Sequence, residues 1–266
     1  MDVVYRSGRS ARLHRLGRRQ VLLDLGWGGV AVAVLGACST GPSTPSNAAA
    51  SGRAGSSSTA TAAGTSSTTV AGELAWKRVN LGFVSAYLLA RGSSVVVVDT
   101  GVAGSTDAIG TALQAASASW DSVTDVVLTH QHADHAGSLG DVAARASRAV
   151  VHAGAADIDK ITSPRPIVAA ADGSDILGMQ IVATPGHTDG HLSVFDRGTR
   201  VLVAGDALGN TSGLTGSNPQ FTADPAKARE SVKVLAALGA STILFGHGEP
   251  LTSGAGEALR TFAGTL

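Results

Sequence analysis

The stretch Thr129-His130-Gln131-His132-Ala133-Asp134-His135 brings three imidazoles and one carboxylate within six residues. The residues before it, Val123 to Leu128, are mostly β-branched and apolar, which predicts a buried strand. The histidines are therefore expected on the loop that leaves the C-terminal end of this strand. Imidazole nitrogens and carboxylate oxygens suit zinc, iron or manganese, whereas the missing thiolate disfavours softer ions. Residues two apart in an extended loop point the same way, so His130 and His132 are expected to share one metal while Asp134 and His135 reach towards a second.

Three later motifs supply further candidate ligands. His187 lies in a T-P-G-H-T motif, Asp206 follows an apolar strand and a glycine, and His247 lies in a late G-H-G. Together with the H-x-H-x-D-H stretch, these motifs resemble the signature of the metallo-β-lactamase-fold hydrolases across roughly residues 74–250. The resemblance implies that Asp206 bridges two metals and that the ligands number seven: His130, His132, Asp134, His135, His187, Asp206 and His247.

The body of the chain, expected from residue 73 to residue 266, reads as short strands interrupted by a few helices. One helix is predicted to begin near Ser105, and another at Pro225 with Asp224 as its cap. Without a steady βαβα alternation, the pattern predicts a layered α/β fold rather than a doubly wound sheet. The resemblance implies an αββα sandwich, with the metals at one edge of two packed sheets. Residues 209–219 are rich in glycine, serine, threonine and asparagine, and they form either a lid or a plain surface loop.

The front of the chain predicts export. Residues 1–20 carry six arginines and one acid, and the 17 residues from Val21 to Ala37 are weakly apolar with an internal aspartate. This layout predicts a signal peptide over residues 1–38, too short and too polar for a good membrane-spanning helix. Arg18-Arg19 resembles a twin-arginine signal and Leu35-Gly36-Ala37-Cys38 a lipobox. Cys38 is therefore expected to carry a lipid that anchors the protein on the outer face of the cytoplasmic membrane. The alternatives are an ordinary basic front end and an incidental cysteine.

Composition distinguishes a linker, residues 39–72, from the folded body that follows it. Residues 39–72 are rich in serine, threonine, alanine and glycine and cannot offset their ordering entropy, which predicts a disordered linker. After Cys38 the chain holds 14 Lys+Arg against 18 Asp+Glu, a formal charge of −4. Such a mildly acidic body has no electrostatic footprint for nucleic acid, so the expected partner is a small-molecule substrate. No cysteine follows Cys38, which excludes disulfides from the body.

The implied chemistry is hydrolysis at two zinc ions, with iron or manganese as alternatives. Ions bridged by Asp206 and a solvent oxygen lower the pKa of that water, and the resulting hydroxide attacks an acyl carbon whose oxygen a metal polarises. Asp134 is the candidate catalytic residue, as a proton carrier; the alternative is a purely ligating role. Asp99, Thr188 and His191 are expected to orient ligand imidazoles, although His191 equally suits an ordinary strand histidine.

Departures from the family pattern narrow the reaction class. β-Lactamases of this fold generally carry cysteine or serine where this chain has Asp206, and the ligand set looks most like that of glyoxalase II and the lactonases. The main hypothesis is therefore a binuclear zinc hydrolase of a small ester, thioester or lactone. The alternative resembles the persulfide dioxygenases, which use one iron at His130, His187 and Asp206 with oxygen as co-substrate. A metal-binding pseudoenzyme is disfavoured because no ligand is missing. Tyr87, the one tyrosine of the body, lies in an early strand and has no evident match to the tyrosine that assists some lactonases.

Overall fold

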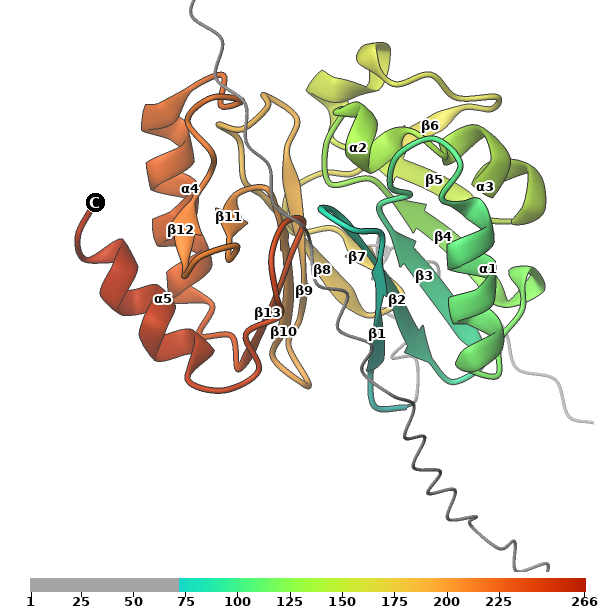
Figure 1. Cartoon of the computed structure of the whole chain (residues 1–266), viewed down its shortest axis with the longest axis horizontal. Helices are drawn as coiled ribbons and strands as arrows, with labels where there is room; N and C mark the ends of the chain where they lie inside the picture. The colour runs from blue at the N-terminus through green and yellow to red at the C-terminus, as the bar shows by residue number, and fades with distance from the viewer. Residues whose placement is uncertain (1–71) are drawn as a thin grey trace, which may run out of the picture. The chain divides into compact units, whose positions relative to one another are not determined.

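Residues 72–266 are described by the computed structural model, and their strands form two sheets packed face to face between layers of helices (Figure 1). The first sheet has six strands, in the order β1 (Ala75–Asn80), β2 (Ser85–Arg91), β3 (Ser94–Val98), β4 (Val123–Val127), β5 (Val150–Ala153) and β6 (Ile167–Ala169). The second has five, in the order β13 (Thr242–Phe245), β10 (Val201–Gly205), β9 (Leu192–Asp196), β8 (Met179–Ala183) and β7 (Asp175–Ile176). A separate pair joins β11 (Leu208–Gly209) to β12 (Thr215–Gly216).

β3 and β10 are apolar on both faces, because helices cover one face of each sheet and the other sheet covers the opposite face. In β3, Val95 and Val97 pack into the cluster under the outer helices, whereas Val96 and Val98 pack into the cluster between the two sheets. β10 alternates in the same way, since Val203 belongs to the cluster between the sheets and Leu202 to the cluster on the far side. Three apolar clusters separated by two sheets confirm the predicted αββα sandwich.

The helices form the two outer layers. α1 (Thr106–Ala115) and α3 (Leu139–Arg145) cover the six-stranded sheet, and α4 (Pro225–Ala237) and α5 (Ala255–Ala263) cover the five-stranded one (Figure 1). The predicted start of α4 is confirmed, since Asp224 accepts hydrogen bonds from the backbone N–H groups of Ala226 and Lys227, each at 3.0 Å. Ser105 precedes α1 as predicted, but its side chain makes no capping hydrogen bond. Three short helical segments were not predicted: α2 (Ala133–Ala136), η1 (Trp120–Ser122) and η2 (Ala155–Lys160).

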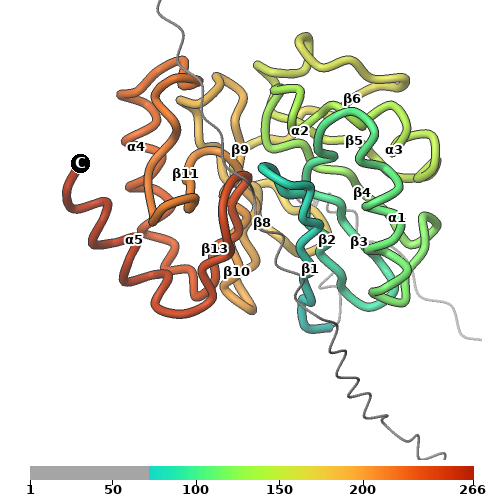
Figure 2. The backbone as a smooth tube through the Cα atoms, viewed as in Figure 1, coloured from blue at the N-terminus to red at the C-terminus, as the bar shows by residue number. Residues whose placement is uncertain are grey.

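Each half of the chain builds one of the two facing sheets (Figure 2). β3 to β6 run parallel, as do β10 and β13, so the loops that follow β4, β10 and β13 leave from the carboxyl ends of parallel strands. Two polar contacts join the sheets near this edge. The backbone N–H of Ser85 donates to the Gly246 carbonyl at 2.9 Å, and the Tyr87 hydroxyl donates to the Phe245 carbonyl at 2.8 Å.

The expected signal peptide over residues 1–38, with its lipid-bearing Cys38, lies outside the described residues. So does the expected linker over residues 39–72, apart from its final glycine. Within residues 72–266, none of the helices combines the length and the apolar character needed to cross a bilayer.

Candidate metal centre

The loop after β4 changes conformation midway, and this change distributes its side chains. His132 has an extended backbone and precedes α2, which holds Asp134 and His135. Its carbonyl accepts the backbone N–H groups of His135 at 3.0 Å and Ala136 at 2.9 Å, closing the first helical turn. His130 and His132 thus lie before the helix, whereas Asp134 and His135 lie within it.

The seven predicted ligands come together at this edge, in three overlapping groups. In the first, His132 Nδ1 lies 3.0 Å from both His130 Nε2 and His187 Nε2. In the second, His247 Nε2 lies 3.3 Å from Asp134 Oδ2 and 3.4 Å from His135 Nε2. The members of the three groups are His130, His132 and His187; Asp134, His135 and His247; and His130, His135 and Asp206. Ligands about 2.0–2.1 Å from a tetrahedral zinc ion are spaced about 3.3–3.4 Å apart, so these separations fit shared ions.

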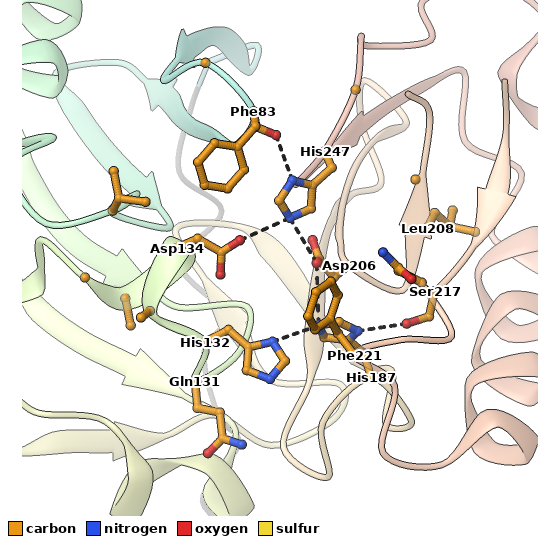
Figure 3. Close-up of a pocket in the computed structure, with 18 of the residues that line it drawn as sticks. Phe83, Gln131, His132, Asp134, His187, Asp206, Leu208, Ser217, Phe221 and His247 are labelled. Carbon is orange, nitrogen blue, oxygen red and sulfur yellow. Dashed lines mark hydrogen bonds and ion pairs between the residues drawn. The ribbon is translucent and has the colours of Figure 1, made fainter. Parts of the chain in front are cut away.

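Asp206 lies between the groups (Figure 3). Its Oδ2 is 3.5 Å from His187 Nε2 and 3.2 Å from His247 Nε2, and its Oδ1 is 3.3 Å from His135 Nε2. Oδ1 is buried yet has no hydrogen-bond partner, since its approach to His135 lacks hydrogen-bond geometry. A buried carboxylate oxygen without a donor is costly unless a cation satisfies it, so Asp206 fits a ligand shared between two ions.

The outer nitrogens of the ligand imidazoles are held by other groups. Nδ1 of His135 lies 2.8 Å from the Asp99 carboxylate, which confirms that Asp99 orients a ligand imidazole. In four of the five imidazoles such a contact leaves Nε2 facing the centre; the partners are Asp99 Oδ2 for His135, Ser217 Oγ for His187, the Phe83 carbonyl for His247 and Thr129 Oγ1 for His130.

The other two predicted orienting residues act elsewhere. Thr188 donates through Oγ1 to Asp157 Oδ2 at 2.6 Å and contacts no ligand imidazole, so that expectation was wrong. His191 is fully buried, and its Nε2 accepts the backbone N–H of Asp206 at 3.0 Å. It therefore positions the backbone of a ligand rather than an imidazole. Burial lowers the pKa of His191 to about 3, which keeps this ring neutral and able to accept.

The two ends of the site differ electrostatically. Burial lowers the pKa of His130 well below its usual value and that of His187 to about 4, so both rings are neutral and ready to bind a metal. The carboxylates of Asp134 and Asp206, at 3.3 and 3.2 Å from its Nε2, instead raise the pKa of His247 to about 10. For His135, burial acts to lower the pKa, but nearby carboxylates outweigh it and raise the pKa. The carboxylates that raise these two pKa values surround the second group, where their negative charge favours a bound cation.

A cleft of about 1920 Å³ opens over the ligands. Phe83 and Phe221, 65% and 56% exposed, line it together with His132, Asp134 and the segment from β11 to Phe221 (Figure 3). Residues 209–219 form one wall, and Ser217 from this wall holds His187. The segment is therefore part of the site rather than a plain surface loop.

Two contributors to the site were not predicted. Arg78 donates to the Gly248 carbonyl at 3.1 Å and forms an ion pair with Glu249 at 2.6 Å, which fixes the loop that carries His247. Asp157, in η2, contacts both segments of the first ligand group. Neither residue stands in a recognisable motif.

Tyr87 is buried and burial raises its pKa to about 12, so its hydroxyl neither faces the cleft nor ionises near neutral pH.

The profile of the metallo-beta-lactamase superfamily matches residues 79–247. The chain is 30% identical to hydroxyacylglutathione hydrolase of Dechloromonas aromatica (strain RCB) over 161 residues, covering 60% of this chain and 55% of that protein. It is 34% identical to the hydroxyacylglutathione hydrolase of Acidiphilium cryptum (strain JF-5) over 167 residues, covering 61% and 63%. The chain thus spans somewhat over half the length of these relatives. The fold is similar to that of a metallo-beta-lactamase family protein from Thermus thermophilus, with a TM-score of 0.58, 22% identity and coverage of 72% and 77%.

Proposed function

Because this chain belongs to the metallo-beta-lactamase superfamily, we propose that it is a metal-dependent hydrolase that cleaves a small ester, thioester or lactone. The observation that carries the proposal is the convergence of seven ligand side chains into two groups joined by Asp206. We assign His130, His132 and His187 to one zinc ion and Asp134, His135 and His247 to the other. The relatives named as hydroxyacylglutathione hydrolases support hydrolysis of an acyl bond.

The protein groups divide the work of this reaction. Divalent ions bound here would supply a water of lowered pKa and polarise an acyl oxygen. Asp134 faces the cleft with its side chain 29% exposed, and its Oδ2 lies 3.3 Å from His247 Nε2. This contact with His247 lowers the pKa of Asp134, so the carboxylate is ionised near neutral pH. We assign it the role of proton carrier.

The cleft supports an acyl substrate with an apolar part. Phe83 and Phe221 are exposed within it, and exposed aromatic rings beside a polar centre provide contact area for apolar groups. Of the two cations that line the cleft, Arg78 is already paired with Glu249, which leaves Lys160 to meet an anionic group.

A second candidate is the single-iron dioxygenase, which would need only His130, His187 and Asp206. The second ligand group argues against it, because it is built as completely as the first. His135 within it is oriented by the buried Asp99, and His247 is held by the Phe83 carbonyl at 2.7 Å. A single-metal enzyme has no evident need for these contacts, and the one between His135 and Asp99 is buried, so its assembly costs free energy.

The test is to purify the protein, measure its metals and assay it without oxygen on a panel of thioesters and lactones. Zinc is redox-inert, so metal identity and reaction class are tested together. We expect two zinc ions per chain and turnover that persists without oxygen. Iron as the sole metal, with oxygen consumed on glutathione persulfide and no cleavage of esters, would overturn the proposal.

We also propose that the mature protein begins at a lipidated Cys38, on the basis of the Arg18-Arg19 pair and the lipobox-like segment that ends at Cys38. Mass spectrometry of membrane-associated protein is expected to detect no peptide upstream of Cys38. Recovery of a soluble chain that retains residues 1–37 would contradict this.

A further inference from the structure

Asp157 is a fully buried carboxylate that lies behind the metal ligands without contacting any of them. It accepts three hydrogen bonds. Its Oδ1 accepts the backbone N–H of Gly190 at 2.9 Å, and its Oδ2 accepts the backbone N–H of Gln131 at 3.1 Å and the hydroxyl of Thr188 at 2.6 Å.

These three donors belong to the two segments that supply the first ligand group. Gln131 stands between His130 and His132, whereas Thr188 and Gly190 stand one and three residues after His187. One carboxylate therefore ties the loop after β4 to the loop before β9. The three imidazoles of this group meet in front of it, with His132 Nδ1 3.0 Å from each of its neighbours.

Close packing around Gly190 supports the same conclusion independently. A Cβ atom on Gly190 would lie 2.6 Å from the Asp157 backbone nitrogen and 2.7 Å from its carboxyl carbon. A Cβ atom on Gly154 would overlap the carbonyl oxygen of Gly190. Only glycines allow η2 to approach the loop after His187 so closely, which brings the carboxylate within reach of backbone N–H groups.

Keeping this charge buried is costly, since Asp157 forms no ion pair within residues 72–266. Two N–H groups and a hydroxyl compensate it, and an ionised carboxylate is the one small side chain that accepts from all three. We propose that Asp157 is a positioning residue that sets the spacing of His130 and His132 against His187, and thereby the affinity of the first metal site. Asp99 has the corresponding place behind the second site, where it holds His135.

The test measures zinc affinity at each site separately, by competition with a chromophoric chelator. His247→Ala disables the second site and leaves the first; His132→Ala does the reverse. In the His247→Ala chain, Asp157→Ala is expected to weaken zinc binding about 10- to 100-fold, the usual effect of removing an outer partner of a metal ligand. In the His132→Ala chain it is expected to change the affinity by no more than about twofold, as for independent sites. Asp157→Asn keeps the shape but places an amide against at least one N–H donor, so it should give an intermediate loss.

Asp196 provides a matched control. It is equally buried, accepts from the backbone N–H and hydroxyl of Thr199 at 2.7 and 2.6 Å, and pairs with Arg91, all at the far end of β9. Asp196→Ala should lower the melting temperature without changing zinc affinity at either site. Equal weakening at both sites by Asp157→Ala, or no weakening at the first, would overturn the proposal. If Asp157→Ala does not fold, Asp157→Asn decides by the same comparison. The inference rests on the proposed metal centre. A wild-type chain that binds no zinc would refute both the proposed function and the role of Asp157. Normal zinc binding by the Asp157 variants would refute the role of Asp157 alone.

Discussion

Replacing Asp206 by alanine tests the metal centre most directly, because this carboxylate lies close to ligands assigned to both ions. Its Oδ2 lies within 3.5 Å of His187 and His247, and its Oδ1 within 3.3 Å of His135. The substitution removes one of four protein ligands from each ion. It also removes the only negative charge assigned to the first ion, whose other ligands are neutral imidazoles.

The size of the effect follows from this charge. Two unit charges about 4 Å apart near a protein surface interact by about 4 kcal/mol, which corresponds to nearly a thousandfold in a dissociation constant. Metal content after dialysis should therefore fall from two ions per chain to one or fewer. Turnover should fall by more than about 100-fold, beyond the usual loss for an outer partner of a ligand. The β-rich fold should persist, since none of the three apolar clusters includes Asp206.

The assay combines metal analysis of dialysed protein, turnover on the best substrate of the panel and far-UV circular dichroism. Asp189→Ala is the matched control: it lies two residues after His187, but its carboxylate is exposed and pairs with Lys227 at 3.5 Å. This variant should keep both metals. An Asp206→Ala protein with two metals and near-normal turnover would remove Asp206 from the centre and refute the reasoning.

Two further substitutions test the surroundings of the site. Gly246→Ala places a Cβ atom onto Asp206 Oδ1, so it should lower metal content. In the double variant with Asp206→Ala, the two losses of metal should not add. Full metal content in Gly246→Ala would contradict the geometry. Tyr87→Phe removes the hydrogen bond to the Phe245 carbonyl and should cost about 1–2 kcal/mol of unfolding free energy with turnover unchanged, whereas a large loss of turnover would reveal a catalytic role. Burial raises the pKa of Tyr87 to about 12, so its neutral form stabilises the fold fully below pH of about 10, and this contribution should disappear as the pH rises through about 12, as followed by phenolate absorbance.

The fold and the clustering of the candidate ligands could be predicted because their signals are local in the sequence. Valine runs such as residues 95–98 of β3 are apolar at every position, which predicts strands buried on both faces. The start of α4 is encoded in a short stretch, because Asp224 caps the helix and Pro225 occupies its first position. His130 and His132 stand two apart in one loop, so they are close in space without any contribution from distant parts of the chain, and their ring nitrogens lie 3.0 Å apart.

The supporting residues could not be predicted, because they act across long separations in the sequence. Asp157 accepts from Gln131 and Gly190, 26 and 33 residues away, and it belongs to a short polar segment with no strand or helix periodicity. Thr188, which was expected to orient an imidazole, binds this carboxylate instead. A hydroxyl can serve either partner, and only the packing of η2 against the loop after His187 decides between them.

The packing of the two sheets, rather than any single motif, completes the centre. The six-stranded sheet supplies His130, His132, Asp134 and His135 from one loop, and the loops of the five-stranded sheet supply His187, Asp206 and His247. Neither sheet alone supplies more than two of the four ligands assigned to each ion. Each site therefore exists only while the sheets are docked. The contacts of Ser85 and Tyr87 lie on the two residues directly before His247 and fix its position relative to Asp134. Because an unfolded chain has no preformed site, zinc that bridges the sheets contributes its binding free energy to their docking.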